Sequence, residues 1–415
     1  MPIKLLLNSS FFSLIVFSAI NPANAYTIFK CYDAQGKIVY SDSSIMCYKN
    51  ARTVAYTTSS STLTPTTTTS TTLSTPTTTT STATTTTIAP TIKTTSTITP
   101  TVTAVTSAVV TDSIFKSTSF WYKQIPAQTT LHADSSKFVQ EFLRQKSAYY
   151  NTVALNTYAY AAPVYIADSN VAPVKLTLNN CQNKSWVDPA FLSMMSAVTI
   201  PSFAKQSSGT DAEMVIYQPS THTLWEMWKA IKDTSGGWSA CWGGRILNTA
   251  ESTGINAQNF GTTATGLPFI GGQITAEELT RGEIKHVMGI ALVNAASYKI
   301  YSWPANRSDG YNPTNAPYRI PEGLRFRLDP TVNVDALPMS KAGKIIAKAA
   351  QKYGFVVWDV AGAISLRAQN ALSYTAMGKP NPYPALYENK PTYAVLNGFP
   401  WDKLQFLPMN YGKPL

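Results

Sequence analysis

Charged residues and histidine are scarce in this 415-residue chain: Asp, Glu, Lys and Arg together make up 13 %, and there are three histidines. His132, His222 and His286 lie far apart and show no metal-ligand spacing. We therefore expect no cofactor and no metal-ligating residues, with a Ca²⁺ ion held by loop carboxylates left open. No run of five Lys or Arg residues occurs, which argues against a nucleic-acid-binding arm.

The common catalytic motifs are absent as well. The chain has no G-x-S-x-G, H-E-x-x-H, Walker or dinucleotide-binding pattern. Residues 261–266 are bounded by glycines, but no helical pattern follows them, so they do not predict a phosphate-binding loop. The sequence assigns no reaction, and enzyme activity stays an open question.

Long hydrophobic runs are missing beyond the N-terminus. Residues 1–25 combine one cation (Lys4), an apolar core over 11–20 and an A-x-A site ending at Ala25, which is typical of a cleaved secretory signal peptide. No later stretch supplies roughly 18 uninterrupted apolar residues, so we expect no transmembrane segment in the mature chain. These features predict a secreted protein or a protein of the periplasm or cell envelope.

Cysteine is rare, with four residues in the whole chain. An even number in an exported protein favours disulfides. Three pairings are possible, and the long tract between the two cysteine sets favours Cys31–Cys47 and Cys181–Cys241. No C-x-x-C spacing occurs, which argues against a four-cysteine zinc site.

Residues 26–51 form a small unit of their own. Apolar residues alternate on both sides of the glycine-containing turn at 33–36, which predicts a β-hairpin. So short a segment cannot bury a sufficient core, and a disulfide would stabilise it. The phrase K-C-Y-D-A-Q-G-K-I-V-Y-S-D resembles the domain-of-unknown-function 4124 family of proteobacterial envelope proteins, which implies an envelope setting and no known activity. The matching residues are Lys30, Cys31, Asp33, Gly36, Tyr40, Ser41 and Asp42.

Threonine dominates residues 52–112, together with Ser, Pro, Ala and Val. Such a tract cannot bury enough apolar surface to offset its chain entropy, so we expect a disordered linker. Thr and Ser with interspersed proline are typical of an extended stalk, which O-linked glycans would stiffen. Stalks of this kind join modules in polysaccharide-active proteins, but a passive spacer has the same composition.

Residues 113–415 form the head, for which the sequence predicts a mainly-β fold. Many short strands with Gly, Pro and Asn turns favour a β-sandwich or jelly roll with a few inserted helices. We expect a hairpin over 355–367 that turns near Gly362. The other expected strands are 164–166, 174–178, 213–217, 222–229, 238–242, 285–293, 298–303 and 324–328, and the expected helices are 135–151, 275–281 and 339–353.

The head also resembles a family of uncharacterised secreted bacterial proteins. The matching phrases include L-W-E-M-W, G-T-T-A-T-G-L-P, G-E-I-K-H-V-M-G-I-A-L, W-P-A-N-R-S-D-G and I-P-E-G-L-R-F-R-L-D-P, and all matches together span roughly residues 221–362. The resemblance implies a shared domain and brings no assigned activity.

A carboxylate beside indole rings is the first candidate site. Strand alternation in T-H-T-L-W-E-M-W places Glu226 and Trp228 on one face, with Trp225 on the other. An indole can stack on a sugar ring while a carboxyl group bonds hydroxyls or protonates an oxygen. The alternative is an ordinary half-buried Glu226 paired with a cation of a neighbouring strand.

Two further candidates follow. His286 is aligned with apolar residues; a desolvated imidazole with a carboxylate partner makes a good base, but a satisfied core histidine fits equally. In W-P-A-N-R-S-D-G, Trp303 and Arg307 could bind a substrate, and Asp309 could act as an acid or base. Turn chemistry alone also explains Asp309.

We therefore predict an exported protein whose head recognises a polysaccharide or cell-surface glycan, with no nucleic-acid partner. Cleavage would follow one of two routes. The first is acid–base hydrolysis by Glu226 with Asp309 or Asp329, and the second is elimination with His286 as base and Arg307 neutralising a uronate. The alternative is a non-enzymatic surface adhesin or envelope-assembly module. An enzyme requires these side chains to meet in one cleft.

Overall fold

The computed structural model describes residues 28–32, 38–41, 55–56 and 113–414. In the N-terminal part, β1 (Ile28–Tyr32) and β2 (Ile38–Ser41) pair antiparallel, and β3 (Ala55–Tyr56) lies on the other side of β1. This pairing confirms the predicted hairpin. The signal peptide 1–25, the Cys31–Cys47 pairing and nearly all of the stalk 52–112 fall outside the described residues.

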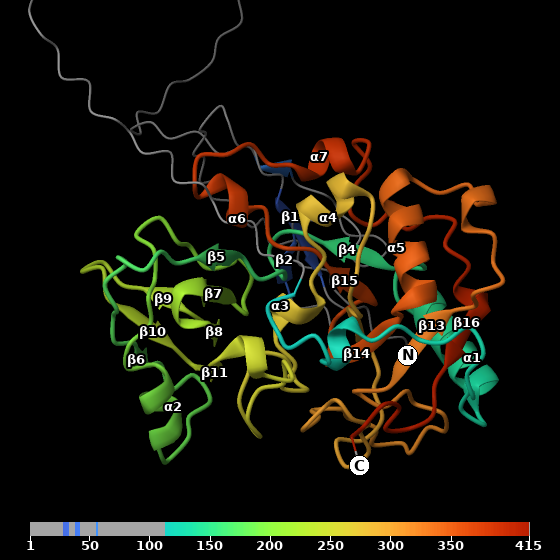
Figure 1. The fold of residues 1–415 in the computed structure, drawn as a ribbon, viewed down its shortest axis with the longest axis horizontal. Coiled ribbons are helices and arrows are strands. Elements are labelled where there is room, and N and C mark those ends of the chain that lie inside the picture. The colour runs from blue at the N-terminus through green and yellow to red at the C-terminus, as the bar shows by residue number, and fades with distance from the viewer. Residues whose placement is uncertain (1–27, 33–37, 42–54, 57–112, 415) are drawn as a thin grey trace, which may run out of the picture. The chain divides into compact units, whose positions relative to one another are not determined.

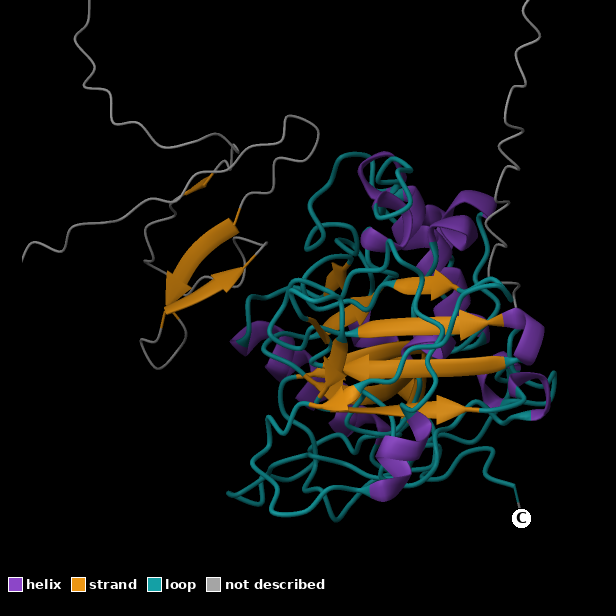
Figure 2. Cartoon of the chain, turned by 90° about the vertical axis from the view of Figure 1, so that its left-hand side faces the viewer, coloured by secondary structure: helices purple, strands orange, loops and turns teal. Residues whose placement is uncertain are grey.

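The head is built on two larger sheets (Figures 1 and 2), with strand orders β16-β13-β14-β12-β15-β4 and β11-β8-β7-β5. Both sheets are mixed, since β12 runs parallel to β14, β15 to β4, and β5 to β7. The six-stranded sheet comprises β4 (Ala154–Asn156), β12 (Met288–Leu292), β13 (Arg325–Leu328), β14 (Phe355–Val360), β15 (Ser365–Arg367) and β16 (Leu404–Phe406). The four-stranded sheet comprises β5 (Val164–Ile166), β7 (Met214–Gln218), β8 (Thr223–Trp228) and β11 (Trp242–Ile246).

The two sheets share a buried layer of side chains, which we call the inter-sheet layer. Strand alternation sends Val215 of β7 and Leu224 of β8 into this layer from one sheet, and Val356 and Trp358 of β14 from the other. Two sheets that close over one apolar layer make a sandwich-like centre. The predicted mainly-β head with inserted helices is thus confirmed.

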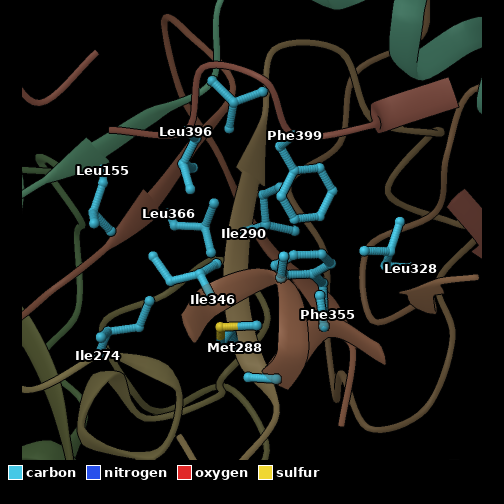
Figure 3. Packing of buried hydrophobic residues seen from close by; sticks show 14 of the residues in the cluster. Leu155, Ile274, Met288, Ile290, Leu328, Ile346, Phe355, Leu366, Leu396 and Phe399 are labelled. Atoms are coloured by element: carbon cyan, nitrogen blue, oxygen red, sulfur yellow. The ribbon is translucent and has the colours of Figure 1, made fainter. Parts of the chain in front are cut away.

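Helices cover the outer face of the six-stranded sheet. Both α1 (Ser135–Ala148) and α5 (Lys341–Lys352) bury an apolar stripe against it, and Ile346 of α5 packs beside Ile290 and Phe355 (Figure 3). Because alternate residues of β12 and β14 point to this face, the strands are apolar on both sides.

A third cluster covers the outer face of the four-stranded sheet. It contains α2 (Pro189–Met194) and a small sheet of order β6-β10-β9, formed by Thr177–Leu178, Trp238–Ala240 and Ile231–Lys232. A disulfide joins Cys181 to Cys241 with an S–S distance of 2.06 Å. The predicted Cys181–Cys241 pairing is confirmed.

Side-chain caps and glycines mark two of the helix ends. At α4 (Ala276–Arg281), the Thr275 hydroxyl accepts the Glu278 amide and the Glu278 carboxylate accepts the Thr275 amide. Gly354 follows α5 at φ 73°, where residues with a Cβ are strained. The remaining α-helices of the described chain are α3 (Phe269–Gly272), α6 (Leu372–Thr375) and α7 (Tyr383–Leu386).

Two local predictions are wrong. Strands β14 and β15 do not pair as a hairpin, because β12 lies between them and bonds to both. Residues 298–303 form turns with a single bridge from Tyr301 to Glu322 instead of a strand. Alternation in the sequence identified the apolar segments, but it could not show which neighbouring strand each segment would pair with. Within the described residues, no helix is long and apolar enough to cross a membrane.

Gly289 tests the packing of the inter-sheet layer. A Cβ on this β12 residue would lie 2.2 Å from the Trp358 ring, whereas a Cβ on Gly362 meets nothing within 4 Å. We expect Gly289→Ala to lower the free energy of unfolding by about 1–3 kcal/mol or more, as overpacking does. Denaturant unfolding of the protein measures this, with Gly362→Ala as control. Equal stability of the two variants would show that Trp358 moves freely.

Candidate functional site

A pocket of about 800 Å³ opens at one end of the inter-sheet layer. This volume is in the range of small-molecule sites. Its walls come from the start of β7, the ends of β8 and β14, strand β15, and the segments 182–188, 259–264 and 307–309. Segments distant in sequence therefore meet around one space.

The pocket continues the inward faces of the strands. On β7, Tyr217 and Val215 point into the apolar layer, and Glu213 follows on the same face. On β8, the same face runs from Leu224 through the buried Glu226 to Trp228, which lines the pocket. Each strand thus becomes polar where the two sheets stop covering one another.

A buried arginine joins the two sheets at the pocket floor. Nη1 of Arg367 on β15 donates to Oε1 of Glu213 at 2.7 Å, and Nη2 donates to Oδ2 of Asp359 at 3.2 Å. Burial raises the pKa of Asp359 to about 7, and the Arg367 charge only partly offsets this. Burial likewise raises the pKa of Glu213. The floor therefore holds a carboxyl group that changes protonation near neutral pH.

A second carboxyl pair lies in the 307–309 wall. Asp309 is exposed to the pocket, and its backbone N–H donates to Oε2 of the fully buried Glu322 at 3.1 Å. Burial and then the Asp309 charge raise the pKa of Glu322 to about 8. Loss of hydration among the surrounding loops also raises the pKa of Asp309, although the residue still reaches solvent. Asp309 is thus the more accessible of the two groups.

Arg307 organises the neighbouring loop. Its guanidinium donates to the carbonyl oxygens of Ala264 (3.0 Å), Gly261 (3.0 Å) and Thr263 (2.8 Å), and also to that of Asn259. Four of the five N–H groups of an arginine are then used by the backbone. Arg307 lines the pocket but has little left with which to bind a substrate carboxylate, in contrast to the expected role.

Glu226 lies behind the pocket wall. It is buried on β8, and its carboxyl oxygens accept the Thr262 hydroxyl at 2.9 Å and the Ile270 amide at 3.4 Å. Burial raises the pKa of Glu226 to about 8, so the group is mainly neutral at pH 7. Thr262 itself lines the pocket. Glu226 therefore supports the loop and does not contact a ligand.

Three tryptophans also line the pocket: Trp186, Trp228 and Trp242. Asp211 accepts the indole N–H of the half-buried Trp228 at 3.0 Å, which fixes that ring. Trp242 is stacked on Phe191, and the Lys184 ammonium lies 3.9 Å from its centroid. Trp186 is 56 % exposed, so its ring is the more available surface for stacking.

The other expected site residues lie elsewhere. His286 contacts both carboxyl oxygens of Glu278, at 3.2 and 3.3 Å, and its Nδ1 lies 2.9 Å from the Val287 carbonyl. Trp225 points to the outer face of the four-stranded sheet, where its indole donates to Met194. Trp303 packs against Phe120 outside the pocket lining. Of the seven expected catalytic and substrate-binding residues, Asp309, Arg307 and Trp228 line the pocket.

Sequence reasoning did not propose Asp211, Glu213, Asp359 or Arg367 as site residues. One signal was available: Asp359 interrupts the apolar run F-V-V-W-D-V, and Arg367 ends I-S-L-R. Charged residues at the ends of apolar strands are expensive unless they pair, so their presence indicates a polar site. The pairing of Asp359 with Arg367 depends on β12 lying between their strands, and the pairing of Arg367 with Glu213 depends on how the two sheets meet.

Comparisons with protein families, curated proteins and solved structures find no match. The two family resemblances seen in the sequence therefore remain predictions. Within the part of the chain that the structure describes, no three His, Cys, Asp or Glu side chains are grouped to hold a metal ion.

Glu226 predicts a pH-dependent stability. Its pKa rises from 4.5 to about 8 on folding, so between these pH values the unfolded chain loses a proton that the folded chain keeps. The free energy of unfolding should fall across this window, by about 1.4 kcal/mol per pKa unit, and level off above it. We expect Glu226→Gln to reduce that fall, with part remaining because Glu322 titrates similarly. Thermal unfolding from pH 5 to 8 measures it.

The matched control for this experiment is Asp402→Asn, since that side chain is 58 % exposed and pairs only with Lys403 among the described residues. It should leave the pH dependence unchanged. A Glu226→Gln variant with the same pH profile as the native chain would contradict a neutral, buried Glu226.

The disulfide should limit local opening of the pocket wall, because Cys181 directly precedes the wall segment 182–188. Removing the bridge in Cys181→Ser with Cys241→Ser should let this segment open locally. We expect trypsin to cleave after Lys184 about tenfold faster in the double variant, since lowering the free energy of local opening by about 1.4 kcal/mol gives that factor. Mass spectrometry of the fragments measures the cleavage rate. Cleavage after the exposed Arg281 is the internal control. Equal acceleration at both sites would indicate global unfolding instead.

Proposed function

We propose that the head binds a saccharide chain in this pocket and hydrolyses a glycosidic bond, with Asp359 as general acid and Asp309 as general base or nucleophile. The observation that carries the proposal is that titratable carboxyl groups and tryptophan rings line one open pocket. Glycosidases use a carboxyl pair with different protonation states and stack sugar rings on aromatic side chains.

The assignment of roles follows from the two environments. Asp359 is the more enclosed, with a side chain 16 % exposed, and its pKa of about 7, raised by burial, lets it hold a proton near neutral pH. The charge of Asp309 raises the pKa of Asp359 further, as expected for two carboxyl groups that cannot both ionise freely. Asp309 reaches solvent, which favours its charged form over that of the more enclosed Asp359.

The chemistry then uses both groups. Asp359 gives its proton to the leaving glycosidic oxygen as the bond to the anomeric carbon breaks. The Asp309 carboxylate removes a proton from the attacking water or bonds to that carbon itself, and the separation of the two carboxyl groups around the substrate decides which. Trp186 and Trp228 would hold the sugar rings.

The lyase route has less support. It requires His286 and Arg307 to meet in one place. However, His286 pairs with Glu278 outside the pocket lining, and the Arg307 guanidinium already donates to backbone carbonyl oxygens. The charge of Asp309 in the pocket wall also opposes a uronate, because it would repel the uronate carboxylate.

A second candidate is a non-enzymatic recognition module, such as an adhesin on a Thr-rich stalk. One observation favours it: Arg367 holds Asp359 in an ion pair that has a structural use whether or not the pocket is catalytic. Both candidates fit an exported protein of the cell envelope or the extracellular space. They differ in whether a bound saccharide is cleaved.

Reducing-end release from a polysaccharide panel by the mature chain tests the proposal. We expect Asp359→Asn and Asp309→Asn to lower kcat/KM by about 10²–10⁴-fold, the usual contribution of an acid or base. Activity of the native chain should fall as pH rises through about 7, where Asp359 loses its proton. Asp402→Asn, at an exposed ion pair, is the matched control.

Binding measurements on the same panel separate the candidates. Trp186→Ala should weaken saccharide binding about tenfold, the cost of one stacking contact of about 1.5 kcal/mol. Binding without hydrolysis would leave the recognition module. If no saccharide binds, both candidates are overturned.

A further inference from the structure

The pocket is acidic in a basic protein. Five of its lining side chains are carboxylic: Asp188, Asp211, Glu213, Asp309 and Asp359. Three are cationic, namely Lys184, Arg307 and Arg367, although the whole chain carries a net charge of +11. A concave site with charge opposite to that of the rest of the surface concentrates ligands of the opposite sign.

The cations of the pocket are already occupied. Arg307 donates to four backbone carbonyls, and Arg367 donates to two carboxylates. The third cation, Lys184, lies over the Trp242 ring. Neither guanidinium can therefore turn to a ligand without breaking bonds inside the fold, which would cost several kcal/mol for buried charged groups.

Carboxylates, in contrast, remain available. Among the described residues, neither Asp309 nor Asp211 forms a salt bridge. Asp309 is exposed in the pocket wall, and Asp211 uses one oxygen for the Trp228 indole. These two carboxylates can accept from a ligand that brings N–H donors and positive charge.

We infer that the pocket selects a saccharide with free amino groups, an unacylated hexosamine polymer, whose ammonium groups bond to Asp309 and Asp211 while its rings stack on Trp186 and Trp228. This inference rests on the proposed function for the saccharide and adds the substrate class. An N-acetylated sugar would remove the charge, and a uronate would reverse it, so both should bind less well.

Titration calorimetry with the mature chain and three oligomers of equal length tests the inference: glucosamine, N-acetylglucosamine and glucuronate. We expect the glucosamine oligomer to bind about tenfold more tightly than its acetylated counterpart, the effect of one charge-assisted bond of about 1.5 kcal/mol. Raising the salt concentration should shrink that preference, since partly exposed charges are screened.

Asp309→Asn should remove most of the preference, because its carboxylate bonds to the ammonium group, while Asp402→Asn should leave the preference unchanged. Equal affinity for the acetylated and free-amine oligomers would overturn this inference and leave the proposed saccharide site intact. Tightest binding of the uronate oligomer would overturn it as well. Failure of all three oligomers to bind would count against the proposed function itself.

Discussion

The ion pair between Arg367 and Glu213 is the contact on which the site depends, because it joins the two sheets where their apolar layer ends. Arg367 belongs to the six-stranded sheet, and Glu213 directly precedes β7 of the other. Both groups are buried, so each would be costly without its partner: breaking such a pair typically costs about 3–5 kcal/mol. The pair therefore fixes how the sheets meet and, with Asp359 on the same guanidinium, places a titratable carboxyl group at the pocket floor.

The loops around the pocket are held from behind in the same manner. Glu226 binds Thr262 and Ile270 in one wall, and Glu322 binds the Asp309 amide in the other. Both carboxyl groups are buried with a pKa of about 8, raised by burial, so they hold the loops mainly as neutral hydrogen-bonding groups. A neutral acid costs less to bury than a carboxylate and does not repel the ionised groups in the pocket. Stability falls at higher pH as the consequence.

Much of this could be predicted from the sequence where one strand or helix decides the outcome. Alternation placed Glu226 and Trp228 on one face of β8, and capping residues marked α4. What the sequence could not show is which segments meet. Whether His286 faces a substrate or Glu278 depends on where α4 packs, and the pairing of Asp359 with Arg367 depends on β12 lying between their strands. Local patterns contain neither fact, because sheet order is set by tertiary packing.

The polar pocket lies where it does because of how two sheets cover one another. Along the inward face of β7, Tyr217 and Val215 are covered by the opposite sheet, and Glu213 lies at the edge of that cover. Beyond the edge, a side chain must be polar to face water, and it must be paired to lie beside the apolar layer. Carboxylates held by one arginine meet both conditions, and their excess over the cations is left for a ligand to neutralise. The same boundary that stabilises the fold thereby creates the acidic lining of the pocket.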